Sequence, residues 1–117
     1  MTGAVSYHGG LAAEDCVARV YEETGHQIEE RRWQSRAGEI DLIARKDGMI
    51  VFVEVKRARD FATAAERIGS RQLARIHRSA EVYLGREPGG TDSAARIDVA
   101  LVNGLGVVEI IENVLAA

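Results

Sequence analysis

The sequence predicts an α/β domain (α+β in its order of elements), in which helices flank a central mixed β-sheet. Three patterns favour this class. Apolar residues recur at helical spacing in two segments, residues 10–24 and 64–84. Aliphatic runs with strand character lie on both sides of Asp47-Gly48, and two more strand-like runs, 97–102 and 107–111, close the chain. The expected order is α-β-β-β-α-β-β, with the hairpin supplying central strands.

The size and charge of the chain fit one globular domain. Its 117 residues can bury a single core. We expect residues 9–117 to form this domain and residues 1–8 to be a flexible arm. The formal net charge is −3, yet residues 29–78 contain 12 of the 15 Lys and Arg but 8 of the 18 Asp and Glu, a local balance of +4. A basic face can therefore exist on an acidic chain, and such a face attracts phosphate.

Several classes of protein are not expected. Cys16 is the single cysteine, so the sequence predicts neither an internal disulfide nor a zinc cluster. The sequence contains no apolar run of about 18 residues, the length that would predict a membrane span. The N-terminus lacks the basic and apolar regions of a signal peptide. We therefore expect a cytoplasmic protein with no membrane partner.

The first predicted helix spans residues 10–24, and Gly25 ends it. Glu14 lies at the border of its apolar stripe, where a carboxylate either extends to solvent or points into a site. The helical period leaves both possibilities open. The stripe consists of Ala13, Cys16, Val17, Val20 and Tyr21.

The next elements are strands. Residues 26–33 predict a strand with one solvent-facing side, and residues 34–38 predict a turn. Residues 39–56 predict a hairpin, because Asp-Gly tolerates the positive φ angles of a two-residue turn. Alternation places Glu54 and Lys56 on one face of its second strand. In its first strand, alternation predicts one face with Ile40, Leu42 and Ala44 and the other with Glu39 and Asp41.

The hairpin brings like charges together. The register of a two-residue turn sets Asp41 opposite Glu54, where like charges destabilise a sheet. A divalent cation between the two carboxylates would remove this conflict, and hard oxygen ligands suit Mg²⁺ or Mn²⁺. The alternative interpretation is an exposed hairpin in which Glu39 and Lys56 form a cross-strand ion pair.

Beyond the hairpin, residues 57–63 predict a loop and residues 64–84 a helix. Gly69-Ser70 is expected to interrupt this helix, with Ser70 capping its second part. The predicted buried face consists of Leu73, Ile76, His77, Ala80, Tyr83 and Leu84, with His77 packed in the core. Another face presents Arg71, Arg75 and Arg78, which are either a solvated basic surface or contacts to phosphates.

Two strands complete the predicted sheet. Gly85 ends the second helix, and Pro88-Gly89-Gly90 forms a loop. Apolar and other residues alternate along 97–102, which predicts a strand. A turn that starts at Asn103-Gly104 leads to the last strand, 107–111.

Two motifs carry a resemblance to a known family. The run Gly38-Glu39-Ile40-Asp41-Leu42-Ile43-Ala44, followed by Val51-Phe52-Val53-Glu54-Val55-Lys56, resembles the YraN family, a small bacterial family described as endonuclease-like. More widely, the chain is similar to the PD-(D/E)XK nuclease superfamily, especially the archaeal Holliday-junction resolvases. The match covers most of the chain and includes Glu14, Arg71-Gln72 and Arg96-Ile97-Asp98. The resemblance implies a restriction-endonuclease-like fold and metal-dependent endonuclease activity.

The resemblance also implies roles for single residues. Asp41 matches the metal-binding Asp of the superfamily, Glu54 the acidic member of its D/E-x-K motif, and Lys56 the lysine. Glu14 matches a helical Glu near the catalytic site, and Gln72 corresponds to a helix glutamine of resolvase-like members. The implied ligands of Mg²⁺ or Mn²⁺ are Asp41, Glu54, the Val55 carbonyl and Glu39. The implied nucleic-acid contacts are Arg57, Arg59, Arg71, Gln72, Arg75 and Arg78.

The departures from the family pattern lie outside the three central residues of the motifs. Lys56-Arg57-Ala58 stands where relatives commonly have Lys-Thr-Arg, and Arg71 stands in place of a usual lysine. Ala62 and Ala13 replace usual glycines. These changes concern contacts to the substrate more than contacts to a metal.

The implied substrate is branched or duplex DNA, cut with structure selectivity or weak sequence specificity. Action on a two-fold branched DNA would favour a homodimer. Two alternatives stay open: a non-catalytic nucleic-acid-binding module or adaptor that keeps the nuclease fold, and a metal-stabilised scaffold that binds no nucleic acid.

Overall fold

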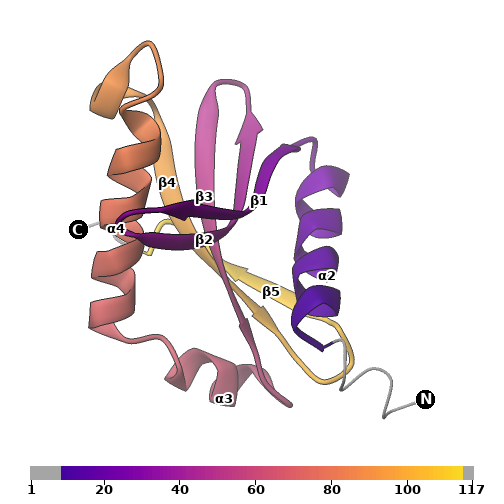
Figure 1. Cartoon of the computed structure of the whole chain (residues 1–117). Helices are drawn as coiled ribbons and strands as arrows, with labels where there is room; N and C mark the ends of the chain where they lie inside the picture. Colours follow the sequence, from indigo (N-terminus) through magenta and orange to yellow (C-terminus); the bar gives the residue numbers. More distant parts are fainter. Residues whose placement is uncertain (1–8, 115–117) are drawn as a thin grey trace.

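The computed structural model describes residues 9–114 (Figure 1). The predicted arm, residues 1–8, lies outside the described residues. The elements are α2 (Gly9–Glu23), β1 (Gln27–Ser35), β2 (Gly38–Lys46), β3 (Met49–Arg57), α3 (Phe61–Glu66), α4 (Ser70–Leu84), η1 (Gly90–Asp92), β4 (Ala95–Val102) and β5 (Val108–Ile111). Within this part of the chain no helix is both long and apolar enough to cross a bilayer.

The five strands form one mixed sheet in the order β1-β2-β3-β4-β5. β3 and β4 are parallel, while the other neighbours are antiparallel. The predicted fold class is therefore confirmed, and the second strand of the hairpin lies at the centre of the sheet. A parallel pair needs a long crossover connection, which here contains α3 and α4. Figure 1 shows α2 on one side of the sheet and α4 on the other.

The alternation of side chains along β3 divides the core into two layers. Val51 and Val53 pack with Val17 of α2 in one layer. Phe52 packs with Ile76 of α4 in the other layer. Glu54 lies two residues beyond Phe52, so it continues the row that faces α4.

The β2–β3 hairpin has the predicted two-residue turn, and Lys46 pairs with Met49. The paired residues end at Leu42 and Val53, one step before Asp41 and Glu54, and the pairing does not extend to Glu39 and Lys56. Asp41 nevertheless interacts with Glu54, as the expected register requires. The side chain of Asp41 also contacts Val55, the next residue of β3. The backbone N–H of Val55 donates a hydrogen bond of 2.8 Å to Asp41 Oδ2.

The first strand of the hairpin also changes face. Leu42 and Ala44 pack on the α2 side, but Ile40 packs on the α4 side with Ile43, so the expected common face of Ile40, Leu42 and Ala44 is wrong. The change coincides with an irregularity in β1, where Arg32 has a φ of +51°. Such local distortion of an edge strand redirects neighbouring side chains.

The predicted loop of residues 57–63 is wrong at both ends. β3 continues to Arg57, and α3 begins at Phe61. Asp60 starts α3, because its side chain accepts a hydrogen bond of 2.8 Å from the Thr63 N–H. The predicted interruption before α4 is confirmed, but Gly69 and not Ser70 occupies the capping position, and no side chain caps this helix.

The buried face of α4 differs from the predicted one at His77. Its side chain is 56% exposed, and its Nδ1 lies 3.1 Å from Glu81 Oε1. Ser79 is buried instead, together with Ile76, Ala80, Tyr83 and Leu84. The periodicity of a helix defines an arc, and His77 lies just beyond the arc that contacts the sheet.

Candidate active site

Glu54 on β3 is the most buried of the candidate carboxylates. It is 5% exposed. Its Oε2 atom lies 3.3 Å from Lys56 Nζ, because residues two apart in a strand share a face. The same oxygen accepts a hydrogen bond from Nε2 of Gln72, in the first turn of α4. The structure thus brings Glu54, Lys56 and Gln72 together at the carboxyl end of the central strand.

Asp41 of β2 is the second carboxylate of this group. The pKa of Glu54 is raised to about 7, first by burial and then by the hydrogen bond and negative charge of Asp41, while Lys56 opposes the shift. A carboxyl group that carries its proton near neutral pH can donate to a neighbouring carboxylate. The pair therefore shares a proton near neutral pH, and full ionisation of both groups would need a further positive charge.

Glu14 of α2 is the third carboxylate. Its side chain is 14% exposed, so of the two possibilities left open by the sequence, the structure selects the one in which it points inward. Burial raises the pKa of Glu14, and the negative charge of Asp41 raises it further. Three carboxylates from three different elements, α2, β2 and β3, therefore influence one another at this place.

Arg32 is a residue of this site that the sequence did not single out. Its Nε lies 3.4 Å from Glu39 Oε1 and 3.9 Å from Glu14 Oε1. The positive charge of Arg32 lowers the pKa of Glu14, against the effects of burial and of Asp41. Glu39 therefore forms an ion pair with Arg32, whereas the alternative interpretation of the hairpin paired it with Lys56. The charge-rich run before Trp33 gave no pattern that distinguishes Arg32 from its neighbours.

The oxygen donors at this place fit a divalent cation of the magnesium type. Carboxylates are the ligands that Mg²⁺ and Mn²⁺ prefer, and a cation would offset the repulsion between Asp41 and Glu54 when both are ionised. Among the residues that the structure describes, no three His, Cys, Asp or Glu side chains are already spaced to hold a metal ion. Glu54 is instead engaged by Lys56 and Gln72, so metal binding would require these side chains to rearrange.

The predicted arginines lie around this group of carboxylates in two sets. Arg57 is the last residue of β3, and Arg59 lies two residues beyond it; Arg59 is 90% exposed and lies 3.4 Å from Asp60. The second set is on α4 and consists of Arg71, Arg75 and Arg78, all exposed. Within residues 9–114, no carboxylate lies within ion-pair distance of these three side chains.

The α4 arginines continue toward the β1–β2 turn. A Cβ atom at Gly38 would lie 2.9 Å from Arg75 Cδ, so Arg75 crosses the backbone of this glycine. Gly38 has a φ of +141°, which also disfavours other residues. Arg71 adjoins Gln72, whose amide contacts Glu54. The basic face of α4 therefore begins beside the carboxylates and extends along the start of β2.

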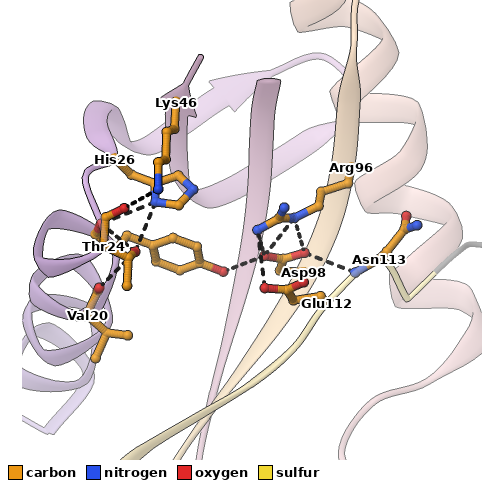
Figure 2. Close-up of polar contacts among 9 residues, drawn as sticks. Val20, Thr24, His26, Lys46, Arg96, Asp98, Glu112 and Asn113 are labelled. Carbon is orange, nitrogen blue, oxygen red and sulfur yellow. Dashed lines mark hydrogen bonds and ion pairs between the residues drawn. The ribbon is translucent and has the colours of Figure 1, made fainter. Parts of the chain in front are cut away.

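A second polar cluster lies on the α2 face of the sheet (Figure 2). Asp98 is fully buried and accepts hydrogen bonds from the Tyr21 hydroxyl at 2.7 Å, Arg96 Nε at 3.0 Å and the Asn113 N–H at 3.0 Å. Burial and the hydrogen bond to Asp98 raise the pKa of Tyr21. Because both oxygens of Asp98 have partners, this cluster is a structural connection between α2, β4 and the chain after β5.

Comparison with known proteins places these features in a family. Residues 13–102 match the model of the uncharacterised protein family UPF0102. A UPF0102 protein of Cereibacter sphaeroides is 50% identical over 117 residues, which is 100% of both chains. A UPF0102 protein of Ruegeria pomeroyi is 51% identical over 111 residues, 95% of this chain and 90% of the relative. A UPF0102 protein of Dinoroseobacter shibae is 37% identical over 105 residues, 90% of this chain and 78% of the relative.

Proposed function

This chain belongs to the uncharacterised protein family UPF0102, also known as the YraN family, and we propose that it is a metal-dependent endonuclease acting on DNA. The predicted family membership is thereby confirmed. The names of the relatives describe no activity, so the proposal rests on the chemistry of the site. Its substrate in this proposal is duplex or branched DNA, cut with structure selectivity or weak sequence specificity.

One observation carries the proposal: two facing carboxylates and a lysine at the carboxyl end of the central strand. Burial and the neighbouring Asp41 raise the pKa of Glu54 to about 7, so ionising both carboxyl groups together is unfavourable. Lys56 lies 3.3 Å from Glu54, and its side chain is 18% exposed. Two neighbouring carboxyl groups that can bind a cation, beside a partly accessible lysine, suit the hydrolysis of a phosphodiester.

Each residue has a distinct task in this proposal. Asp41 and Glu54 hold the magnesium or manganese ion, with the Val55 carbonyl and Glu14 or Glu39 as further oxygen donors. When bound, the ion supplies Lewis acidity and makes water a stronger nucleophile near neutral pH. Lys56 orients the attacking water or stabilises the negative charge that develops on the phosphoryl oxygens.

The exposed arginines provide the contacts to the nucleic-acid backbone. Arg71, Arg75 and Arg78 form one basic face, and Arg57 and Arg59 lie at the end of β3. Arginine pairs well with phosphate oxygens, but such contacts carry no sequence information. Binding is therefore expected to be weakly specific and to fall with salt concentration.

The test is cleavage of a panel of DNA substrates with Mg²⁺ or Mn²⁺: linear duplex, flap, four-way junction and single strand. Wild type is compared with Glu54→Gln and Lys56→Met, which keep the size of each side chain. Both variants are expected to lose activity by about 100-fold or more, because each removes a group that acts in the transition state. Glu81→Gln, at an exposed position of α4, is the control and should cut like wild type.

A second candidate function is a nucleic-acid-binding module without cleavage. The contacts that favour it are those of Lys56 and Gln72, which already engage the Glu54 carboxylate. If wild type binds branched or duplex DNA but does not cut any substrate with either metal, this second function replaces the first. Absence of both binding and cutting would contradict both.

A further inference from the structure

Three exposed large hydrophobic residues gather in one segment, from the end of β4 through β5. Leu105 is 89% exposed, Val107 51% and Ile111 38%. Single exposed apolar residues are ordinary. Leu105 is unusual because nearly all of its side chain extends into solvent from the tip of the β4–β5 turn.

The β4–β5 turn holds Leu105 in a defined position. Asn103 Oδ1 accepts hydrogen bonds from the backbone N–H groups of Leu105 at 2.9 Å and of Val107 at 3.0 Å. The Asn103 N–H donates to the Val107 carbonyl at 3.1 Å, and the Gly106 N–H donates to the Asn103 carbonyl at 3.1 Å. An Asn side chain that bonds two following backbone groups fixes a turn. Leu105 is therefore presented on a rigid support.

The turn adjoins the end of β3 that carries the candidate active site. Lys56 pairs with Leu101 and Arg57 pairs with Val102, so the parallel strands β3 and β4 end together. The Gly104 N–H donates a hydrogen bond of 3.1 Å to the Arg59 carbonyl. Figure 1 shows this turn and the end of β3 on the same side of the molecule. The turn that carries Leu105 therefore contacts the backbone of Arg59, two residues beyond Arg57 at the end of β3, and both arginines are exposed.

We propose that Leu105 is a wedge that packs against an unstacked base at a branch point of the DNA. The inference rests on the proposed function and extends it, because it assigns the choice of branched DNA to a residue outside the catalytic group. Arg57 and Arg59 hold the phosphates beside the branch, while the apolar side chain replaces a stacking neighbour. Proteins that bind bent or distorted duplexes often insert apolar side chains between base steps, with basic side chains nearby.

The small apolar area at the turn favours nucleic acid over a second copy of this chain. Basic and acidic side chains both lie near the turn, because Arg59 is 3.4 Å from Asp60 and Glu109 of β5 is exposed. The exposed apolar surface of Leu105, Val107 and Ile111 is small beside the roughly 800 Å² per partner of a stable interface. A polyanion with an exposed apolar base satisfies both the arginines and the leucine.

The experiment measures binding without cleavage, in EDTA, to a four-way junction and to a linear duplex of the same length. The junction carries 2-aminopurine at the branch point, because its fluorescence rises when the base loses its stacking neighbours. Wild type is compared with Leu105→Ala and Leu105→Met, and Ile111→Ala is a matched apolar truncation away from the turn. Sedimentation of each variant reports its oligomeric state.

Leu105→Ala should weaken junction binding roughly tenfold, the effect of leaving one leucine unburied, and should abolish the rise in fluorescence. Its binding to the linear duplex should change less than about twofold, since the phosphate contacts are unaffected. Leu105→Met and Ile111→Ala should behave like wild type. Leu105 is exposed, so its replacement leaves the fold intact.

Other outcomes separate the two proposals. If Leu105→Ala binds the junction and the duplex with the same affinities as wild type, the wedge proposal is overturned. The endonuclease proposal then still stands. A wild-type dimer that Leu105→Ala converts to a monomer would also overturn the wedge, in favour of a contact between copies. If wild type binds neither DNA, the proposed function fails and the wedge fails with it.

Discussion

At Glu54, the stability of the fold favours the protonated carboxyl group, whereas the proposed function uses the ionised carboxylate. Its pKa in the folded protein is about 7, above its ordinary value of 4.5. The folded state therefore holds a proton that the unfolded state releases between these values. Because the folded state binds more protons, stability is fully present below about pH 4.5 and is lost as the pH rises through about 7. A buried carboxylate that weakens the fold at neutral pH is expected where function requires it.

We predict that Glu54→Gln stabilises the metal-free protein, because the amide donates to Asp41 as the protonated carboxyl does and never ionises. The gain over wild type should be small near pH 5 and reach up to about 3 kcal/mol at pH 8. Urea unfolding in EDTA, at several pH values between 5 and 8, measures this gain in stability. Glu66→Gln, at an exposed position of α3, should follow wild type at every pH. A gain that does not grow with pH would contradict the assigned pKa.

Arg32 is a second residue whose replacement is informative. Its guanidinium partly neutralises Glu14 and Glu39, so Arg32→Ala leaves the site more negative. We predict that this variant binds Mn²⁺ roughly threefold to tenfold more tightly than wild type, measured by calorimetry at pH 8. Arg19→Ala is the matched control, because Arg19 is exposed on α2 and is not among the charges that shift the pKa of Glu14. Weaker Mn²⁺ binding by Arg32→Ala would instead mean that Arg32 orients the carboxylates.

The element that most clearly combines fold and proposed function is α4. One arc of this helix contacts the sheet through Ile76 and Tyr83, and Gln72 extends that arc to Glu54. The arc on its other side presents Arg71, Arg75 and Arg78. A single helix therefore supports the Glu54 carboxylate with one side chain and offers a basic face with others.

The basic face of α4 gives a prediction at the scale of the element. Arg78→Gln should weaken binding to all DNA substrates by a similar factor and reduce the slope of log affinity against log salt by about one. The measurement is DNA binding at several salt concentrations in EDTA. Arg19→Gln, on the exposed side of α2 across the sheet, should leave affinity and slope unchanged. An equal loss in both variants would show that only net charge matters.

At the scale of the whole molecule, the Asp98 cluster connects parts that are far apart in the sequence. Tyr21 and Asp98 are 77 residues apart and bond at 2.7 Å. We predict that Tyr21→Phe lowers the free energy of unfolding by about 1.5–3 kcal/mol, the value of a hydrogen bond to a charged group. Urea unfolding measures this loss. Mn²⁺ affinity should stay at the wild-type value, and a parallel loss of Mn²⁺ binding would contradict a purely structural role for the cluster.

The sequence alone determined the mixed sheet, the turn at Asp47-Gly48 and the pairing of Lys46 with Met49, because these follow from local periodicity and turn chemistry. It also singled out Asp41, Glu54 and Lys56, which lie together in the structure. Only the tertiary structure decided that β2 changes face at Ile40, that Arg32 joins the carboxylates and that His77 is exposed. Strand distortion and helix rotation depend on how distant elements pack, and the pattern of neighbouring residues does not encode them.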